Sequence, residues 1–166
     1  MKNEKKYLLF LVENQQSYAF MLKYKLLKRT QYQMLCFKTS EECLENIYLN
    51  PDLILIDSQL PGKSLADLLK FLLKQAPKIP VLILATAEEM EDSEELRAIH
   101  VRYNKRTILD YVENEDNTTM LADRVVTRVS KIFEKQRIRK LKSRRRLLLL
   151  SLLLISVAIG ALLLIQ

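Results

Sequence analysis

The feature that most restricts the fold of this 166-residue chain is an uncharged stretch of 19 residues, Leu147–Ile165. Only Ser151, Ser156 and Gly160 interrupt its large apolar side chains. As a helix it would extend about 28 Å, close to the thickness of a bilayer's hydrocarbon core. It is apolar on every face, unlike an amphipathic helix at a membrane surface. We therefore predict a single-pass transmembrane helix, a tail anchor. The alternative, a buried core helix, is less favoured because the 146 preceding residues could scarcely surround it.

A strongly basic segment, residues 131–146, lies directly before this stretch. It holds nine Lys or Arg residues and one Glu, whereas residues 1–130 hold 18 basic and 19 acidic residues. The chain's net charge of +7 is therefore local. An excess of Lys and Arg stays on the cytoplasmic side of a membrane and attracts anionic lipid headgroups. We expect a juxtamembrane helix or linker here, with the preceding domain on the cytoplasmic side. A nucleic-acid-binding arm is the less favoured reading, because Phe133 alone interleaves the charges.

Composition excludes several classes of protein. Two Gly and four Pro argue against a turn-rich all-β fold, and two Cys with one His exclude a disulfide framework or a zinc cluster. Cys36 and Cys43 lie in apolar stretches, so we expect both to be buried. No phosphate-binding loop, dinucleotide fingerprint or hydrolase motif occurs, and we expect no enzyme of those kinds.

Short runs of consecutive apolar residues predict strands of a parallel sheet covered on both faces. The clearest are Tyr7–Val12, Leu53–Ile56 and Val81–Leu84, and the weaker candidates are Met34–Phe37 and Val101–Tyr103.

Helical patterns separate these runs. They cover residues 17–27, 41–49, 64–73 and 88–98, and a long last helix begins near Asn117 or Thr118. Thr39 or Ser40 is the expected N-cap of the second helix, and Ser64 with Asp67 fits a capping box at the start of the third. Strands that alternate with helices predict an α/β fold with a doubly wound, five-stranded parallel sheet over residues 5–130.

Ligands of such a sheet bind beyond the carboxyl ends of its strands. The residues expected there are Glu13, Asn14, Asp57, Ala85, Thr86 and Lys105. Carboxylates suit Mg²⁺, while a hydroxyl and an ammonium group suit phosphoryl oxygens. The sequence therefore predicts a site for Mg²⁺ and a phosphoryl group.

Four sequence blocks in this order resemble the receiver domain of response regulators. The strongest is PDLILIDSQLPG, from Pro51 to Gly62, in which an Asp ends the strand and a Pro follows four residues later. The others are Val12-Glu13-Asn14 after the first strand, PVLILATA over residues 80–87, and Asn104-Lys105. The resemblance covers residues 5–130 and implies a flavodoxin-like receiver fold.

The resemblance also implies roles for individual residues. Asp57 would accept the phosphoryl group, and Lys105 would pair with it. Glu13, Asp57 and the backbone carbonyl of Gln59 would ligate Mg²⁺, with Asn14 as a weak fourth ligand. Thr86, or Ala85 in an ungapped alignment, would occupy the switch hydroxyl position. Such a protein assists its own phosphorylation and dephosphorylation and is otherwise no enzyme.

Three departures from the receiver pattern indicate a degenerate site. Asn14 replaces the usual second acidic residue, so Mg²⁺ should bind weakly. Arg106 replaces the Pro that usually follows the Lys, and Arg102 replaces the usual aromatic residue.

Two readings of function follow. The first is a membrane-tethered receiver in a two-component phosphorelay, which takes phosphate from a histidine kinase or phosphotransfer protein and signals by binding an effector protein. The second is a phosphate-independent pseudo-receiver, a membrane-anchored interaction module. A homodimer is compatible with both.

Overall fold

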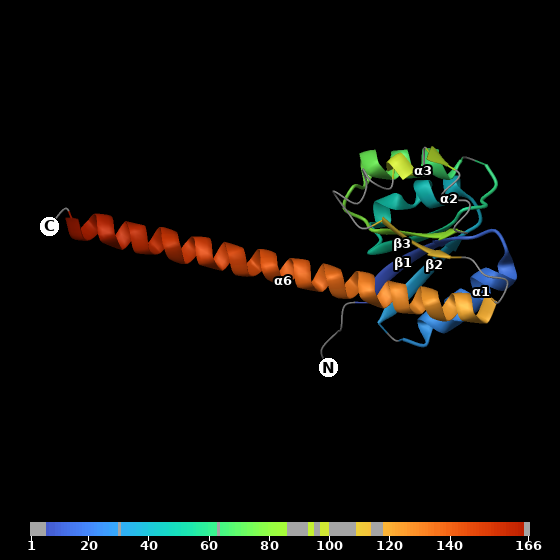
Figure 1. Ribbon diagram of the computed structural model, residues 1–166, viewed down its shortest axis with the longest axis horizontal. Coiled ribbons are helices and arrows are strands. Elements are labelled where there is room, and N and C mark those ends of the chain that lie inside the picture. The colour runs from blue at the N-terminus through green and yellow to red at the C-terminus, as the bar shows by residue number, and fades with distance from the viewer. Residues whose placement is uncertain are drawn as a thin grey trace. The chain divides into compact units, whose positions relative to one another are not determined.

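The computed structural model describes residues 6–29, 31–62, 64–85, 93–94, 97–99, 109–113 and 118–164. Its sheet contains five parallel strands in the order β2-β1-β3-β4-β5 (Figure 1). The strands are β1 (Tyr7–Val12), β2 (Tyr32–Phe37), β3 (Leu53–Asp57), β4 (Val81–Ala85) and β5 (Leu109–Glu113). The predicted α/β fold with a parallel, five-stranded sheet is confirmed.

Helices cover both faces of this sheet. They are α1 (Gln16–Leu27), α2 (Ser40–Glu45), the 3₁₀ turn η1 (Ile47–Leu49), α3 (Leu65–Gln75) and α6 (Thr118–Leu164). Figure 1 shows α2 and α3 on one face of the sheet, and α1 with the beginning of α6 on the other. Most of the helix predicted over residues 88–98 lies outside the described residues.

Side-chain hydroxyl groups cap the N-termini of two helices, as predicted. Thr39 Oγ1 accepts a hydrogen bond from the backbone N–H of Glu42 at 3.2 Å, at the start of α2. Ser64 Oγ accepts one from the N–H of Asp67 at 3.2 Å, and its own hydroxyl donates to the Asp67 carboxylate at 2.9 Å. The two bonds donated by backbone N–H groups satisfy donors that the first turn of a helix leaves without a partner.

The core forms on both faces of the central strands. Phe10, Val12, Ile54 and Ile56 pack in one buried cluster with Leu68, Leu69 and Leu72 of α3. Side chains alternate along a strand, so the buried Leu9, Leu11, Leu53 and Leu55 face the opposite side. α1 covers that side and buries Leu22 and Leu26. Double burial explains why these strands are continuous apolar runs.

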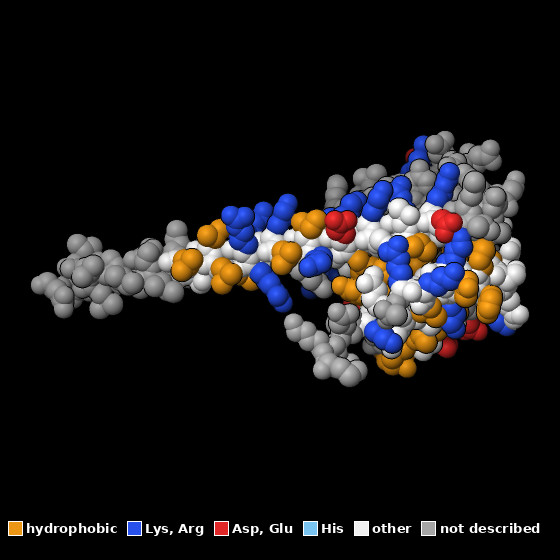
Figure 2. Space-filling model, turned by 90° about the horizontal axis from the view of Figure 1, so that it is seen from below, with side chains coloured by type: hydrophobic (Ala, Val, Ile, Leu, Met, Phe, Trp, Pro, Cys, Tyr) orange, Lys and Arg blue, Asp and Glu red, His pale blue; other side chains and the backbone are white. Residues whose placement is uncertain are grey.

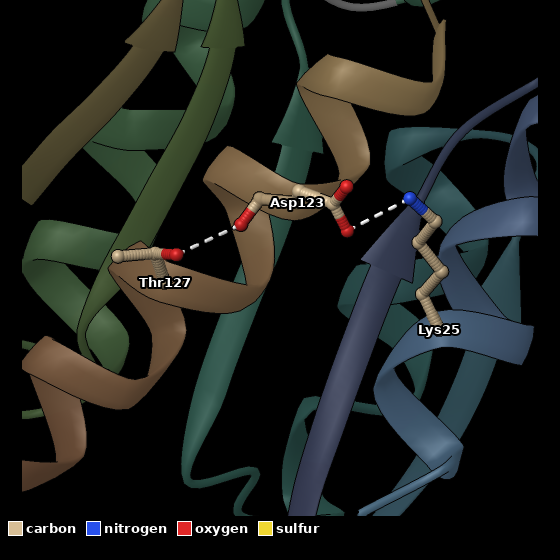
Figure 3. Close-up of polar contacts among 3 residues, drawn as sticks. All are labelled: Lys25, Asp123 and Thr127. Carbon is tan, nitrogen blue, oxygen red and sulfur yellow. Dashed lines mark hydrogen bonds and ion pairs between the residues drawn. The ribbon is translucent and has the colours of Figure 1, made fainter.

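A salt bridge ties α1 to the beginning of α6. Lys25 Nζ lies 2.8 Å from Asp123 Oδ1, and the Thr127 hydroxyl donates to the backbone carbonyl of Asp123 one turn further along α6 (Figure 3). Because the Asp123 side chain is largely exposed, this pair orients the two helices more than it stabilises them.

The fifth strand corrects the prediction made from the sequence. We predicted it at Val101–Tyr103, which lies outside the described residues, but the strand that pairs with β4 is Leu109–Glu113. This segment, LDYVE, contains two charged residues among three apolar ones, and it lies at the edge of the sheet. A search for continuous apolar runs misses such a strand. The other edge strand, β2, has exposed positions too, and Cys36 is exposed there although Cys43 is buried as predicted.

The chain divides into two compact units, Met1–Val129 and Ser130–Gln166. Within the described part of the chain, no helix combines the length and the apolar character needed to cross a membrane. The transmembrane helix expected over residues 147–165 stays a prediction.

Candidate functional site

Two buried carboxylates meet at the carboxyl edge of the sheet. β1 and β3 are neighbouring parallel strands in which Val12 lies opposite Ile56. Glu13 directly follows Val12, and Asp57 directly follows Ile56. Neighbouring strands lie about 4.8 Å apart. Glu13 is 4% exposed and Asp57 is 7% exposed. The register of β1 and β3 therefore brings the two acidic residues, Glu13 and Asp57, together at the carboxyl edge of the sheet, where the sequence predicted them.

Glu13 is held in an environment that opposes its charge. Burial, and secondarily the negative charge of Asp57, raise the pKa of Glu13 from its ordinary value of 4.5 to about 7. Hydrogen bonds from the backbone act in the opposite direction. The N–H of Gln15 donates to Glu13 Oε1 at 2.8 Å, and the N–H of Asn14 contributes as well. Near neutral pH this carboxyl group therefore exchanges a proton readily, and a bound cation would favour its ionised form.

Backbone pairing between β3 and β4 fixes the position of Asp57 and of the residue that follows it. Asp57 ends β3 opposite Leu84, and the N–H of the following Ser58 donates to the carbonyl of Leu84 at 2.9 Å. Gln59 and Asn14, the other predicted ligands, are exposed residues that follow the two carboxylates closely in sequence. Both therefore lie near the same edge of the sheet.

The donor set fits a weak Mg²⁺ site. Among the described residues, no group of three or more His, Cys, Asp or Glu side chains is placed to hold a metal ion. Mg²⁺ keeps several of its waters and is commonly bound by one or two carboxylates together with phosphate oxygens. Glu13 and Asp57 supply two carboxylates, and the backbone carbonyl of Gln59 is the third candidate ligand.

The predicted hydroxyl and ammonium groups are not placed by the structure. Thr86 lies outside the described residues, and β4 ends in the buried Ala85, which has no hydroxyl. Lys105 also lies outside them, and its place at the carboxyl edge stays a prediction. Lys105 precedes β5 in the sequence, and β5 ends at Glu113, in register with Ala85.

Tyr18 is a residue of this edge that the sequence analysis missed. It lies in the first turn of α1, directly after the loop that carries Glu13. Its hydroxyl is buried and has no hydrogen-bond partner in the described structure. Burial first, and then the negative charges of Glu13 and Asp57, raise the pKa of Tyr18. The available signal was its position five residues after Glu13, at the start of the next helix.

No protein-family model matches the sequence, and no curated protein matches it. Solved structures do match. The signal receiver domain of a Vibrio parahaemolyticus protein has a TM-score of 0.65 at 23% identity, covering 82% of this chain and 96% of that one. The phosphorylated cyanobacterial phytochrome response regulator RcpA has a TM-score of 0.62 at 22% identity, covering 76% and 92%. This chain has the receiver fold.

A further match comes from a different kind of protein. It belongs to a family of redox sensors in the streptococci that evolved from two-component response regulators, with a TM-score of 0.65 at 21% identity. The match covers 80% of this chain and 53% of that one. Identities this low establish the fold alone.

Proposed function

We propose that this protein is a signalling module that accepts a phosphoryl group on Asp57 and acts by binding an effector protein. The observation that carries the proposal is the register of β1 and β3, which brings Glu13 and Asp57 together at the carboxyl edge of the sheet. This is the edge at which open α/β sheets bind their ligands. The receiver fold of the matched structures supports the same reading.

The residues define a simple transfer step. A carboxylate oxygen of Asp57 attacks the phosphorus of the donor, so that an acyl phosphate bond forms. The bond from phosphorus to the donor's leaving group breaks, and the leaving group keeps the electron pair. The donor is a phosphohistidine on a histidine kinase or a phosphotransfer protein. Mg²⁺, held by Glu13, Asp57 and the Gln59 carbonyl, would supply positive charge for the phosphoryl oxygens.

The location proposed for this module is the cytoplasmic face of a membrane. Residues 147–165 are uncharged and long enough to span the hydrocarbon core, and residues 131–146 carry a net charge of +8. These features of the sequence support a membrane-spanning helix with the receiver fold on the basic side. Phosphorylation would then change which partner the module holds at the membrane.

A second candidate function is a phosphate-independent interaction module. It is favoured by Asn14, which replaces the second acidic residue that the resemblance leads one to expect and leaves two buried carboxylates, Glu13 and Asp57. Mg²⁺ would then bind weakly, and a phosphoryl group on Asp57 would have less positive charge to balance its own. The streptococcal redox sensors that evolved from response regulators are an example of this fold outside the phosphorelay.

Phosphate uptake separates the two candidates. The full chain, in a non-ionic detergent, is incubated with acetyl phosphate and Mg²⁺, and its intact mass is measured. We expect the mass of one added phosphoryl group, absent in Asp57→Asn and present in Asp67→Asn, a matched change of an exposed aspartate on α3. A folded wild-type chain that gains no mass would refute the acceptor role and support the phosphate-independent module.

A further inference from the structure

The Tyr18 hydroxyl occupies an unusual position for a polar group. Its oxygen is shielded from solvent, yet the described structure gives it no hydrogen-bond partner. Burying a hydroxyl without a partner destabilises a fold, whereas a phenylalanine ring would fill the same space without that cost. Stability alone therefore gives no reason for a hydroxyl here, and a buried polar group of this kind calls for another explanation.

The fold places the first turn of α1, which carries Tyr18, at the acidic pair. Glu13 to Gln15 join β1 to α1, so the first turn of α1 lies at the carboxyl edge of the sheet. Along β3, the alternation of side chains places Asp57 on the same face as Leu53 and Leu55, which is the face that α1 covers. The negative charges of Glu13 and Asp57 both contribute to the raised pKa of Tyr18. The phenol therefore stays protonated at physiological pH and remains a hydrogen-bond donor.

The Tyr18 phenol would add a buried donor to this edge. β4 ends in Ala85 and β5 ends in Glu113, so neither strand ends in a hydroxyl or a cation. A phosphoryl group on Asp57 brings oxygens that carry negative charge and accept strong hydrogen bonds. A buried, protonated phenol close to that group could then gain a hydrogen-bond partner, which the described structure does not give it.

We propose that the Tyr18 hydroxyl donates a hydrogen bond to a phosphoryl oxygen on Asp57. The inference rests on the proposed acceptor role of Asp57, and it adds a contact residue to that site. Because the bond forms with the charge that the phosphoryl group brings, it stabilises the approach to the phosphorylated state more than the unmodified state. No bond to carbon, oxygen or phosphorus is made or broken at Tyr18 itself.

The experiment compares the full chain with Tyr18→Phe and Tyr24→Phe, all in the same detergent with acetyl phosphate and Mg²⁺. Tyr24 is the matched control because it lies on the same helix and is 57% exposed. We expect Tyr18→Phe to slow phosphate uptake by about tenfold or more, the effect of losing one hydrogen bond to a charged group. Its thermal midpoint should be no lower than that of the wild type. Tyr24→Phe should take up phosphate at the wild-type rate.

Three outcomes would count against the inference. Equal uptake rates in the wild type and Tyr18→Phe would overturn it while leaving Asp57 as the acceptor. An equal slowing in Tyr24→Phe would overturn it too, since the effect would then not be specific to the buried hydroxyl. No uptake by the wild type would refute the acceptor role itself, and the inference would fall with it.

A spectroscopic measurement keeps the inference testable if Tyr18→Phe does not fold. The chain contains no tryptophan, so its near-ultraviolet absorption comes mainly from tyrosine. A phenol that begins to donate a hydrogen bond absorbs at longer wavelength. Phosphorylation should therefore produce a red-shifted difference spectrum in the wild type and in Tyr24→Phe, and none in Asp57→Asn. A wild-type protein that is phosphorylated without this shift would overturn the inference.

Discussion

Glu13 should make the stability of this protein depend on pH in an unusual direction. Its pKa is about 7 in the folded chain and close to 4.5 when unfolded, so between these values the folded state binds more protons than the unfolded state. The free energy of unfolding should therefore fall as pH rises from 4.5 to 7, by roughly 1.4 kcal/mol per unit in the steepest part. Below 4.5 and above 7 the contribution of this group is constant.

The size of the effect follows from the shift. Integrated over the window, ionising Glu13 costs about 3 kcal/mol, which is a large share of the 5–15 kcal/mol typical of a folded domain. Glu13→Gln removes the ionisation and keeps an oxygen that can accept the 2.8 Å hydrogen bond from the N–H of Gln15. We expect this variant to be more stable than the wild type at pH 8 and nearly equal to it at pH 4.5.

Urea denaturation of the full chain in a non-ionic detergent, followed by circular dichroism at pH 4.5 to 8, measures this difference. Glu45→Gln is the control, because Glu45 is exposed at the end of α2 and should not change the slope. Parallel stability curves for the wild type and Glu13→Gln across this range would refute the reasoning. They would mean that burial and the neighbouring Asp57 do not act on Glu13 as the structure indicates.

Three further predictions concern the metal, a helix cap and the tail. Asn14→Asp adds a carboxylate beside Glu13 and Asp57 and should tighten Mg²⁺ binding about fivefold in a calorimetric titration, because most of the added attraction is offset by repulsion within the empty site. An unchanged affinity would show that residue 14 does not face the metal. Ser64→Ala removes the N-cap of α3 and should lower the free energy of unfolding by about 1 kcal/mol in urea titrations, with Lys74→Ala as an exposed control on the same helix. A loss equal to that of the control would argue against the cap. Finally, the full chain should stay in the membrane pellet through salt and alkaline washes, whereas a chain ending at residue 146 should not. Release of the full chain by salt would indicate electrostatic attachment by residues 131–146 instead of a spanning helix.

Sequence reasoning succeeded where local signals are strong. Tyr7–Val12, Leu53–Asp57 and Val81–Ala85 are strands because consecutive apolar side chains can be buried on both faces only in the middle of a covered parallel sheet. Thr39 and Ser64 were predictable as caps because a hydroxyl just before a helix satisfies a free N–H through local geometry alone. The pairing of Glu13 with Asp57 followed from the fold, since both were expected where neighbouring strands end.

Other features depend on contacts between distant parts of the chain. The fifth strand was misplaced because LDYVE contains two charged residues and is no continuous apolar run. It lies at a sheet edge, where one strand neighbour is missing. Lys105, which we expected after that strand, lies outside the described residues, and its place at the carboxyl edge stays a prediction. The pKa of Glu13 near 7 and the unpartnered hydroxyl of Tyr18 could not be read from residue types. Both arise from desolvation, which depends on how closely α1 and the strands pack around those atoms, and only the tertiary structure sets that packing.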